Sequence, residues 1–576
     1  MTELISAKYL SILCAAIIQL NLKVSTGLAE PIHRFFQLPS YYKIVMIPYF
    51  AVMVILLVYG MHRSWLVLVY FLNRHKAPVC PPDPIEWPRV TVQLPIYNER
   101  YVIERLVDAV ALFDYPLDRL EIQVLDDSTD DTQEIARACV ERYQALGLPI
   151  HYLHRSDRTG FKAGALAAGL DSATGELIAI FDADFLPTPD FLRRAVPYLT
   201  DPRIGMIQTR WTYLNRDYSV LTKVEALMLD GFFGMEHLSR SRSGVFFNFT
   251  GTAGVWRRAA IDEAGGWEHD TLTEDIDLSY RAQLCGWRLL YMPEIECPSE
   301  LPVEMTAFKE QQARWSKGSM QVGIKLLPRL LRSKQSFRIK AEAFLHLTGA
   351  ITCPFMLVLT ALLLPSMIVR FNQDWVHSNL ADIPSAVLTF SVYIFYSASQ
   401  RVLYPRNWKR AMLYLPVMLG VGFALSLRLS KAVIEAIWGV KSDFVRTPKL
   451  NIAGPSESWH GKKYRTPAGW LPYFEIAFGL YFAFTIVYLA LNRNYRAIPF
   501  LLLFVWGFLY TGILSLGQVW WKRKQPVASQ TPIYSVSSAV SDDPAVFAMR
   551  DKSGELTCQD TASIIENRTR PPQILD

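Results

Sequence analysis

The chain has 576 residues, long enough for more than one domain, and its hydrophobic residues, 51% of the total, gather in blocks near the N-terminus and after residue 343. Its 59 basic and 53 acidic residues leave a net charge of +6, and so small an excess argues against a nucleic-acid-binding protein. Its seven cysteines are scattered with no CxxC pair, which argues against a disulfide framework or a zinc site and fits a reducing compartment.

The N-terminal region is expected to cross a membrane once. Residues 9–20 are apolar but too few to span a bilayer. They fit an interfacial helix or a degenerate signal region, and a helix that docks on the rest of the protein is the favoured interpretation. Residues 44–72 are the first convincing span. His62 and Arg63 interrupt it, which predicts either a membrane boundary at that level or a long, tilted helix. The basic run 74–76 that follows is typical of the cytoplasmic side.

A globular α/β domain is expected after a proline-rich linker at 79–88. Short apolar runs, rich in β-branched and aliphatic residues, alternate there with helical patterns. This alternation predicts a mostly parallel sheet with helices on both faces, and such sheets bind ligands beyond the carboxyl ends of their strands. The predicted strands are 89–96, 120–125, 149–153, 177–182 and 204–208, and the predicted helices are 99–112, 130–146, 162–171 and 189–199.

The C-terminal half of the chain has the pattern of a membrane region. Residues 303–343 are amphipathic and basic, as in helices that lie on a membrane surface. If the globular domain and the polar loop 440–470 both face the cytoplasm, an even number of spans must separate them. The block 411–429 is therefore predicted to be interfacial or re-entrant. The apolar blocks of this half are 344–369, 383–398, 411–429, 471–491 and 498–519.

These patterns divide the chain into five regions. Membrane regions flank the α/β domain, and the chain ends in a polar tail, low in aromatic residues, that is expected to be disordered. The regions are 1–84 with its span at about 44–72, 85–302 as the α/β domain, 303–343 as the interfacial helices, 344–524 as the C-terminal membrane region with the loop 440–470, and 525–576 as the tail.

Two acidic clusters follow predicted strands. The first is the run 126–130, whose carboxylates can accept hydrogen bonds from a nucleobase or ribose, or can merely cap the next helix. The second is Asp182-Ala183-Asp184, where two carboxylates one residue apart can hold a hard divalent cation, Mg²⁺ or Mn²⁺. Such an ion keeps open positions for diphosphate oxygens. The position of this pair at a strand end favours the metal site.

Two further clusters open or line predicted helices. Thr273-Glu274-Asp275 reads as an N-cap threonine with first-turn acids, and one of these carboxylates could also deprotonate an attacking hydroxyl. Gln311, Arg314 and Trp315 share one helix face. Their amide, guanidinium and indole groups suit a sugar acceptor and a diphosphate, although an ordinary interfacial aromatic anchor would give the same pattern. The phosphate-loop and dinucleotide-binding glycine motifs are missing, which argues against an NTPase or a dehydrogenase.

Taken in this order, the four clusters resemble the signature of processive family-2 glycosyltransferases of the cellulose synthase type: an aspartate, DxD, a TED-type acid and QxxRW. Longer stretches of the chain are similar to the plant cellulose synthase-like A and C proteins. Those proteins make β-1,4-mannan or glucomannan and the β-1,4-glucan backbone of xyloglucan. The resemblance spans roughly 85–520, and the stretches that carry it are Leu94–Glu99, Val124–Asp130, Gly160–Leu166, Phe181–Phe185, Gly251–Arg257 and Glu274–Leu278.

The resemblance implies a GT-A glycosyltransferase domain and a role for each motif residue. Asp184, together with Asp182, would hold Mg²⁺ or Mn²⁺. Asp275, beside Glu274, would be the general base, and Trp315 would contact the acceptor end of the glycan. The residues implied for the nucleotide, its ribose and its diphosphate are Tyr97, Glu99, Asp127, Lys162, Asp182, Gln311 and Arg314.

The family also has a gating loop, FxVTxK, that closes over the donor. The corresponding residues are 444–449, of which Phe444, Thr447 and Lys449 match the motif. Arg446 stands where the motif has valine. Closure of this segment over the donor phosphates is still expected, because the threonine and the lysine are kept.

The expected function is an inverting, processive hexosyltransferase that extends a β-1,4-linked mannan, glucomannan or glucan and passes it across the bilayer. Its donor would be GDP-mannose or UDP-glucose, and its catalytic domain would face the cytoplasm from the inner or plasma membrane if the protein is bacterial. Two alternatives stay open. One is transfer of a single sugar to a membrane lipid, by enzymes that often lack a full QxxRW. The other is a transporter with a regulatory domain, which predicts ionisable residues buried within the spans.

Overall fold

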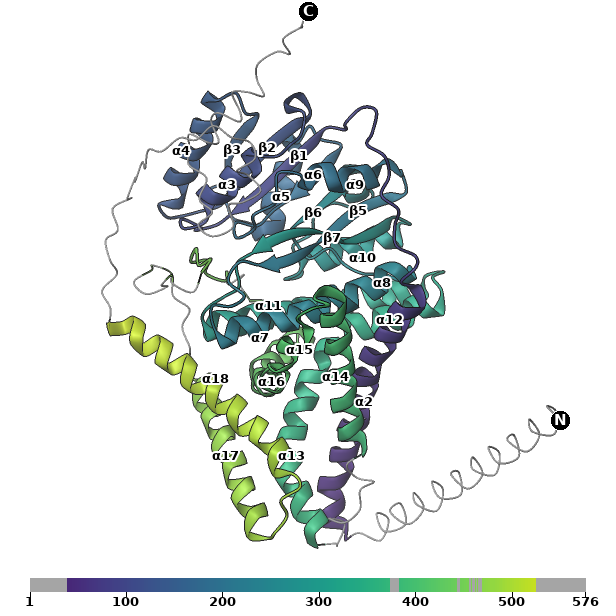
Figure 1. The fold of residues 1–576 in the computed structure, drawn as a ribbon, viewed down its shortest axis with the longest axis vertical. Coiled ribbons are helices and arrows are strands. Elements are labelled where there is room, and N and C mark those ends of the chain that lie inside the picture. The colour runs from purple at the N-terminus through teal and green to yellow at the C-terminus, as the bar shows by residue number, and fades with distance from the viewer. Residues whose placement is uncertain are drawn as a thin grey trace, which may run out of the picture.

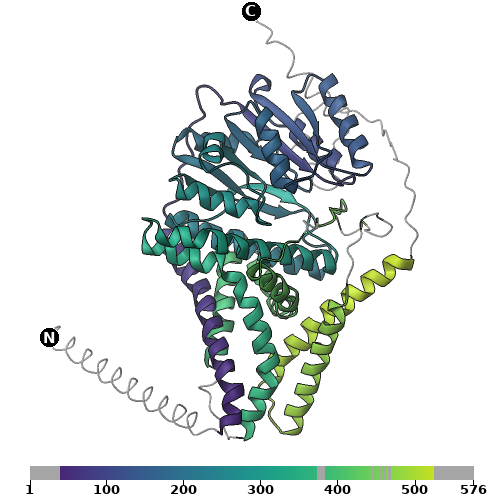
Figure 2. The same cartoon turned by 180° about the vertical axis from the view of Figure 1, so that it is seen from behind.

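The computed structural model describes residues 39–372, 383–442, 446–454, 457, 462, 464 and 469–524. The α/β domain lies on top of a group of long helices that extend away from it (Figure 1). The same arrangement is visible from behind in Figure 2. The predictions for residues 9–20, for Phe444 and for the tail 525–576 lie outside the described residues.

The α/β domain contains, within the described residues, a seven-stranded mixed sheet of order β3-β2-β1-β4-β6-β5-β7. All neighbouring strands are parallel except β6, which is antiparallel to both β4 and β5. The predicted mostly parallel sheet is therefore confirmed. The strands are β1 Val90–Ile96, β2 Leu120–Asp126, β3 Ile150–His154, β4 Leu177–Ile180, β5 Ile204–Tyr213, β6 Gly254–Arg257 and β7 Arg288–Ser299.

Two apolar cores cover the two faces of this sheet. Because successive side chains of a strand point to opposite faces, Leu177 and Ala179 of β4 lie in one core, and Ile178 and Ile180 lie in the other. Helices α3, α4 and α6 pack on the first face, and α5, α9 and α10 pack on the second. They are α3 Ile103–Ala111, α4 Thr132–Ala145, α5 Phe161–Ser172, α6 Phe191–Ala195, α9 Arg258–Glu263 and α10 Glu274–Leu284.

The strand register aligns the carboxyl ends of three central strands. Ile96 of β1 pairs with Asp126 of β2, and Gln93 of β1 pairs with Ile180 of β4. The polypeptide segments that leave β1, β2 and β4 therefore start at one edge of the sheet. These segments carry the acidic residues identified in the sequence.

A layer of helices separates the sheet from the long helices below it (Figure 1). Helix α7 begins with a capping box between Ser219 and Thr222. It packs its apolar residues against α14 and α16 through one core and against the α/β domain through another. The helices of this layer are α7 Val220–Gly231, a π-helical turn at Phe232–His237, α8 Leu238–Ser243, α11 Met305–Arg332 and α12 Phe337–Leu347.

Five helices among the described residues are long and apolar enough to cross a membrane, which is the pattern expected of a multi-pass integral membrane protein. Helix α14, predicted as a span, is not among the five, since it carries several serine, threonine and glutamine side chains. The helices of the membrane region are α2 Ser40–Asn73, α13 Thr352–Asn372, α14 Ile383–Leu403, α15 Trp408–Met412, α16 Leu415–Ile437, α17 Leu471–Leu491 and α18 Ile498–Lys524, and short 3₁₀ turns occur at Leu117–Arg119, Val196–Thr200 and Gly349–Ile351.

Helix α16 runs across the other long helices: it is seen end-on in Figures 1 and 2, directly below α11. Half of its most apolar window is buried inside the protein, the largest share among the five candidate spans. It is nevertheless long and apolar enough to span a bilayer. The prediction that 411–429 is interfacial therefore stays a prediction, and the crossing direction of α16 favours it.

Helix α2 is a single continuous helix of 34 residues despite its internal charged residues. His62 Nε2 lies 2.9 Å from Glu342 Oε2 of α12, and Ser239 Oγ of α8 donates to the carbonyl of Leu66 at 2.8 Å. The C-terminal part of α2 thus packs against the layer of helices below the sheet. His62 finds its polar partner there, at the level where the domain meets the membrane helices.

Candidate active site

Two adjoining pockets lie at the carboxyl ends of the central strands, and the motif residues that the structure describes all line one or both of them. The first pocket contains Tyr97, Glu99, Asp127 and Thr447. The second contains Glu274, Asp275, Gln311 and Trp315. Residues common to both are Lys162, Asp182, Asp184, Arg314 and Lys449.

In the first acidic cluster, Asp127 is the carboxylate that reaches the first pocket. It is buried and accepts two hydrogen bonds from Arg155, at 2.8 and 2.6 Å. Its neighbours have structural roles: Asp126 accepts from Ser128 N, and Asp130 accepts from Thr132 N at the start of α4. Asp130 thus supports the start of the next helix, as the capping interpretation expects, and the role of Asp127 in nucleotide binding stays a prediction.

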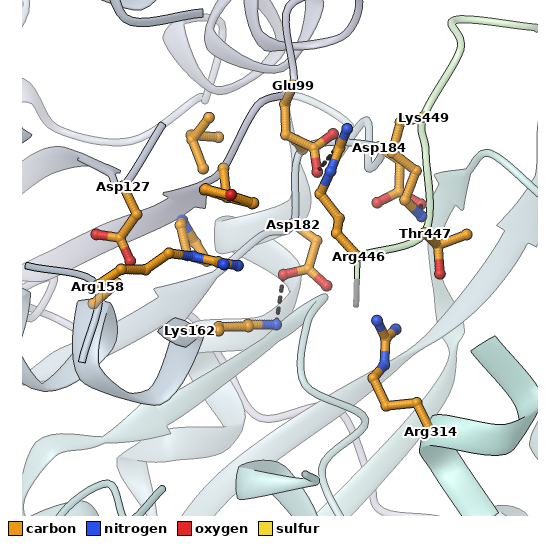
Figure 3. Close-up of a pocket in the computed structure, with 15 residues that line it drawn as sticks. Glu99, Asp127, Arg158, Lys162, Asp182, Asp184, Arg314, Arg446, Thr447 and Lys449 are labelled. Carbon is orange, nitrogen blue, oxygen red and sulfur yellow. Dashed lines mark hydrogen bonds and ion pairs between the residues drawn. The ribbon is translucent and has the colours of Figure 1, made fainter. Parts of the chain in front are cut away.

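The turn after β1 carries Tyr97 and Glu99 and is tied to the turn after β2. Asn98 adopts a left-handed φ of +53°, its N–H donates to Ser128 Oγ, and its side chain accepts from Thr129 N, both at 2.8 Å. Asparagine tolerates this strained backbone better than most residues. The two residues that flank Asn98 both line the first pocket, where Glu99 is labelled in Figure 3.

Arg158 covers one side of the first pocket. Its guanidinium carbon lies 3.3 Å from the centroid of the Tyr97 ring, and a second contact reaches Phe161 at 4.9 Å. Burial lowers the pKa of Arg158, while Tyr97 and Asp127 oppose that shift. A cation stacked on an aromatic ring beside a buried carboxylate is an arrangement that suits a planar base and its phosphates.

Asp182 and Asp184 lie at the junction of the two pockets, and each is paired with a lysine (Figure 3). Lys162 Nζ is 2.5 Å from Asp182 Oδ1, and Lys449 Nζ is 2.6 Å from Asp184 Oδ2. Within the described part of the chain, the remaining carboxylate oxygen of each aspartate has no recorded partner. Two carboxylates with one available oxygen each, beside a polar pocket, fit a divalent cation that takes its other ligands from a diphosphate.

Residues 446–452 lie across the first pocket. Arg446 Nη1 is 2.9 Å from Glu99 Oε1, and Leu450 N donates to Glu300 Oε1 at 2.9 Å. Burial raises the pKa of Glu99 to about 7, against the opposing effect of Arg446 and Lys449. The arginine that departs from the FxVTxK motif therefore has a defined partner. It holds this segment down on the pocket.

Asp275 is a carboxylate of the second pocket whose pKa is clearly raised. Burial and the neighbouring Glu274 raise the pKa of Asp275 to about 7, while the backbone N–H of Ile276, 2.8 Å from Oδ1, lowers it. Burial also raises the pKa of Glu274, against the effect of Lys162, which lies 4.0 Å away. A carboxylate with a pKa near neutrality is suited to accept a proton and release it again.

The segments around Asp275 approach so closely that only glycine fits at two positions. Gly251 has a φ of +82°, and a Cβ there would lie 3.2 Å from Asp275 Oδ2. A Cβ on Gly318 of α11 would lie 2.4 Å from Thr273 Cγ2. Thr273 stands at the N-cap position of α10, but its side chain makes no capping hydrogen bond. The expected threonine cap is therefore wrong; this side chain packs against α11.

Helix α11 brings Gln311, Arg314 and Trp315 to the second pocket, and Arg314 also reaches the first. Burial lowers the pKa of Arg314, although Glu274 and Asp182 oppose the shift. Trp315 is partly buried against the second core of the sheet. One helix that lies on the membrane side of the domain thus supplies a cation, an amide and an indole to the same cavity.

Sequence comparison identifies the domain that holds these pockets. Residues 88–318 match the model described as "Glycosyltransferase like family 2". This domain belongs to the family-2 glycosyltransferases. The seven-stranded mixed sheet lies in this matched region, and the five long apolar helices lie before and after it in the chain.

Several proteins similar to this chain carry the name glucomannan 4-β-mannosyltransferase. Glucomannan 4-β-mannosyltransferase 2 of Arabidopsis thaliana is 44% identical over 254 residues, 43% of this chain and 48% of that protein. Glucomannan 4-β-mannosyltransferase 1 of Oryza sativa subsp. japonica is 42% identical over 273 residues, 46% of this chain and 52% of that protein. The matched region thus spans about half the length of these relatives. A solved structure, the mannosyltransferase PcManGT from Pyrobaculum calidifontis in complex with GDP-Man and Mn²⁺, shares 23% identity at a TM-score of 0.46, over 68% of this chain and 99% of that one.

A separate acidic group in the glycosyltransferase domain is an ion-pair cluster. Carboxylate oxygens of Glu268, Asp270 and Asp277 lie close enough together to hold a cation. Lys325 Nζ occupies the centre of this group, at 2.5, 2.6 and 2.9 Å from the three carboxylates. All three carboxylates contact this one lysine, whereas Asp182 and Asp184 each keep one oxygen atom without a partner in the described part of the chain. The aspartates at the junction of the two pockets are therefore the better candidates for a metal site.

Sequence reasoning missed several residues that line or support the two pockets. Arg155 and Arg158 sit in a polar turn without any periodic pattern, so no local signal marks them. Glu225 lines the second pocket from α7. Glu225 lies between Leu221 and Leu229 at helical spacing, so it interrupts the apolar face of the helix. This interruption is the one signal that could have identified Glu225.

Proposed function

We propose that this protein is an inverting, processive hexosyltransferase that extends a β-1,4-linked mannan or glucomannan, with GDP-mannose as its donor. The observation that carries the proposal is the junction of the two pockets. There, Lys162, Asp182 and Arg314 lie between a charged pocket suited to a nucleotide diphosphate and a second pocket that contains Asp275 and Trp315. Similarity to proteins named glucomannan 4-β-mannosyltransferase supports mannose rather than glucose as the transferred sugar.

The donor would bind in the first pocket. Tyr97, Glu99 and Asp127 would contact the nucleoside, and Arg158 would cover the base. Lys449, which now pairs with Asp184, would close over the phosphates together with Thr447, whose buried hydroxyl has no partner among the described residues. Charged donors already placed in a buried site stabilise a leaving group without further reorganisation.

Asp182 and Asp184 would hold Mg²⁺ or Mn²⁺, which when bound offsets the negative charge of the diphosphate. Lys162 and Arg314, whose side chains reach both pockets, would add positive charge on the other side of the same phosphates. Burial opposes the charge on Lys162, but Asp182 and Glu274 outweigh it and raise the pKa of Lys162. Lys162 therefore stays protonated at neutral pH and can neutralise the leaving group.

Asp275 would be the general base of a single displacement. Its carboxylate takes the proton of an acceptor hydroxyl while that oxygen bonds to the anomeric carbon. The bond from this carbon to the diphosphate oxygen breaks, and the diphosphate leaves as the nucleotide. One displacement of this kind converts an α-linked donor into a β-linked product. A positioned base contributes on the order of 10²–10⁴-fold to such a step.

The membrane helices would carry the product across the bilayer from a cytoplasmic catalytic domain. The second pocket is lined by α7 and α11, which pack on the membrane helices. Basic runs follow α2 at 74–76 and end α18 at 522–524, on the side where the domain lies (Figure 1). Basic runs mark the cytoplasmic ends of spans. A polymer that leaves the second pocket downward would enter the helices directly.

The proposal is tested with purified protein in lipid nanodiscs, supplied with labelled GDP-mannose or UDP-glucose and Mn²⁺ or Mg²⁺. We expect GDP-mannose to give a polymer that an endo-β-1,4-mannanase degrades. A product from UDP-glucose alone, digested by an endo-β-1,4-glucanase, would refute the donor assignment. Label recovered only in a chloroform–methanol extract would refute polymer synthesis and favour transfer to a lipid.

A further inference from the structure

Glu225 is a buried carboxylic acid whose two side-chain oxygens have no hydrogen-bond partner within the part of the chain that the structure describes. Its residue is 0% exposed. It lies in α7 and lines the second pocket, and it does not line the first. The carboxyl group therefore meets the second pocket alone, with no protein group that satisfies it.

Helix α7 positions this side chain at the boundary between the catalytic domain and the membrane helices. Leu221, one turn before Glu225, belongs to the core shared with α14 and α16, and Leu229, one turn after it, belongs to the core of the α/β domain. Leu229 also lines the second pocket. Glu225 thus lies on the membrane side of a cavity whose other wall carries Asp275.

An unpartnered buried carboxyl is a net cost to folding, because the group gives up its hydrogen bonds to water and gains none in return. A cost of this kind is typical of residues kept for a ligand. Burial raises the pKa of Glu225 well above its usual range, and Lys449 only partly opposes this. The protonated acid can donate one hydrogen bond and accept others, which matches the hydroxyl groups of a neutral sugar.

Other buried polar atoms of the second pocket also lack hydrogen-bond partners among the described residues. Gln311 Oε1, Thr250 Oγ1 and Thr273 Oγ1 are buried without partners among the described residues, and all three residues line the second pocket. Two indole rings, Trp211 and Trp315, line it too. Unsatisfied polar atoms can bind the hydroxyl groups of a sugar, and flat aromatic rings can pack against its apolar face. A pocket that combines the two suits a sugar ring.

We propose that Glu225 binds hydroxyl groups of the acceptor glycan's terminal sugars and so positions the attacking hydroxyl against Asp275. The inference rests on the proposed function, which assigns the second pocket to the acceptor. Glu225 acts through hydrogen bonds to the acceptor and not on the reacting proton. Removal of the Glu225 carboxyl should therefore weaken acceptor binding and leave donor binding in the first pocket unchanged.

The test compares Glu225→Leu and Glu225→Gln with the wild-type protein in nanodiscs, and uses Asp217→Asn as the control. Asp217 lies just before α7 and its side chain is 80% exposed, so its variant removes a carboxylate without touching the pocket. The acceptor is a soluble manno-oligosaccharide such as mannohexaose. The measurements are the KM for the acceptor, the KM for the donor, the Kd for GDP and the melting temperature.

We expect Glu225→Leu to raise the acceptor KM about tenfold or more, which corresponds to the loss of one or two buried hydrogen bonds. Glu225→Gln, which keeps donor and acceptor atoms, should recover part of this loss. The GDP Kd should stay within about twofold, and the melting temperature of Glu225→Leu should equal or exceed that of the wild type, because an unsatisfied polar group is removed. An unchanged acceptor KM, or a lower melting temperature with weaker GDP binding, would overturn the proposal.

Equilibrium binding of mannohexaose, followed by tryptophan fluorescence without donor, separates this inference from the proposed function. If the wild type transfers no hexose but binds the oligosaccharide, and Glu225→Leu weakens that binding, the proposed reaction fails and the role of Glu225 stands. If transfer occurs and the two proteins bind the oligosaccharide equally, the role of Glu225 fails and the reaction stands. Failure of the wild type to bind any oligosaccharide would refute both the proposed reaction and the proposed role of Glu225.

Discussion

The two pockets at the candidate active site differ in how their carboxylates are paired. In the first pocket, charges are already balanced by the protein: Asp127 is held by Arg155, Glu99 by Arg446, and Asp184 by Lys449. In the second pocket, Glu225 and Gln311 keep oxygen atoms without partners among the described residues. Two neighbouring cavities that share one wall are therefore prepared for ligands of different kinds.

This difference has a physical meaning for binding. A ligand of the first pocket must exchange existing ion pairs for its own, so it has to bring charge, as a metal-bound diphosphate does. A ligand of the second pocket meets unsatisfied polar atoms beside indole rings and needs hydroxyl groups rather than charge. The contrast predicts that mutations and conditions separate into two groups, one affecting the donor and one affecting the acceptor and the chemical step.

The largest effect is expected for Asp275→Asn, which removes the proposed base from the wall of the second pocket. The turnover number should fall by about 10²–10⁴-fold, while the GDP Kd changes little, because the amide keeps the shape of the carboxyl. Steady-state kinetics and calorimetric titration with GDP measure the two quantities. Asp262→Asn, an exposed carboxylate on α9, is the control. A weakened GDP affinity in Asp275→Asn would contradict the assignment of donor binding to the first pocket and the chemical step to the second.

A smaller loss is expected for Arg155→Met in the first pocket. The change leaves Asp127 buried without its bidentate partner, and an unsatisfied buried charge of this kind costs about 1–3 kcal/mol or more. The donor KM should rise roughly five- to hundredfold, with little change in the acceptor KM. Arg137→Met, exposed and outside both pockets, serves as the control. Equal rises in both KM values would mean that the two pockets are not independent.

The pH dependence of the chemical step should follow Asp275. Its pKa is raised to about 7, and a general base works only when it is deprotonated. The turnover number should therefore increase with pH up to about 7, level off above, and fall about tenfold for each pH unit below it. Measurement at saturating donor and acceptor isolates this step. A flat profile between about pH 5 and 8 would contradict the assignment of Asp275 as the base.

The smallest effect is expected from salt. Because the first pocket works through ion pairs, raising the salt concentration to about 0.5 M should weaken donor binding a few-fold by screening. Acceptor binding, which depends on neutral hydrogen bonds and ring contacts, should change less than twofold under the same conditions. Parallel titrations of donor and acceptor KM against salt give the comparison. A stronger salt effect on the acceptor would reverse the assignment of the two pockets.

Most of the catalytic framework could be predicted from local sequence. Strands such as Leu177–Ile180 are marked by short apolar runs, and the acids directly after them, Asp182 and Asp184, lie at the strand ends for that reason. The face shared by Gln311, Arg314 and Trp315 follows from helical spacing alone. In these cases the information lies within one element, since the element's own period determines where each side chain points.

Strands β6 and β7 were not predicted, and they need long-range information. Strand β6 is a four-residue insertion, antiparallel between two strands, and its burial depends on both neighbours. It brings Thr252 next to Asp182, whose N–H donates to the threonine hydroxyl at 2.8 Å. No periodicity in four residues could have revealed a contact over 70 positions of sequence.

By itself, the sequence determined the α/β order, the apolar helices, and the acids, amide, arginine and tryptophan to which we assign the chemistry, because periodicity and strand ends are local properties of the chain. Tertiary structure alone decided that Arg155 neutralises Asp127, that Arg446 reaches Glu99, and that Glu225 meets a cavity instead of a partner. Whether a charge is paired, buried or available depends on groups from distant segments. Such neighbours exist only once the chain has packed.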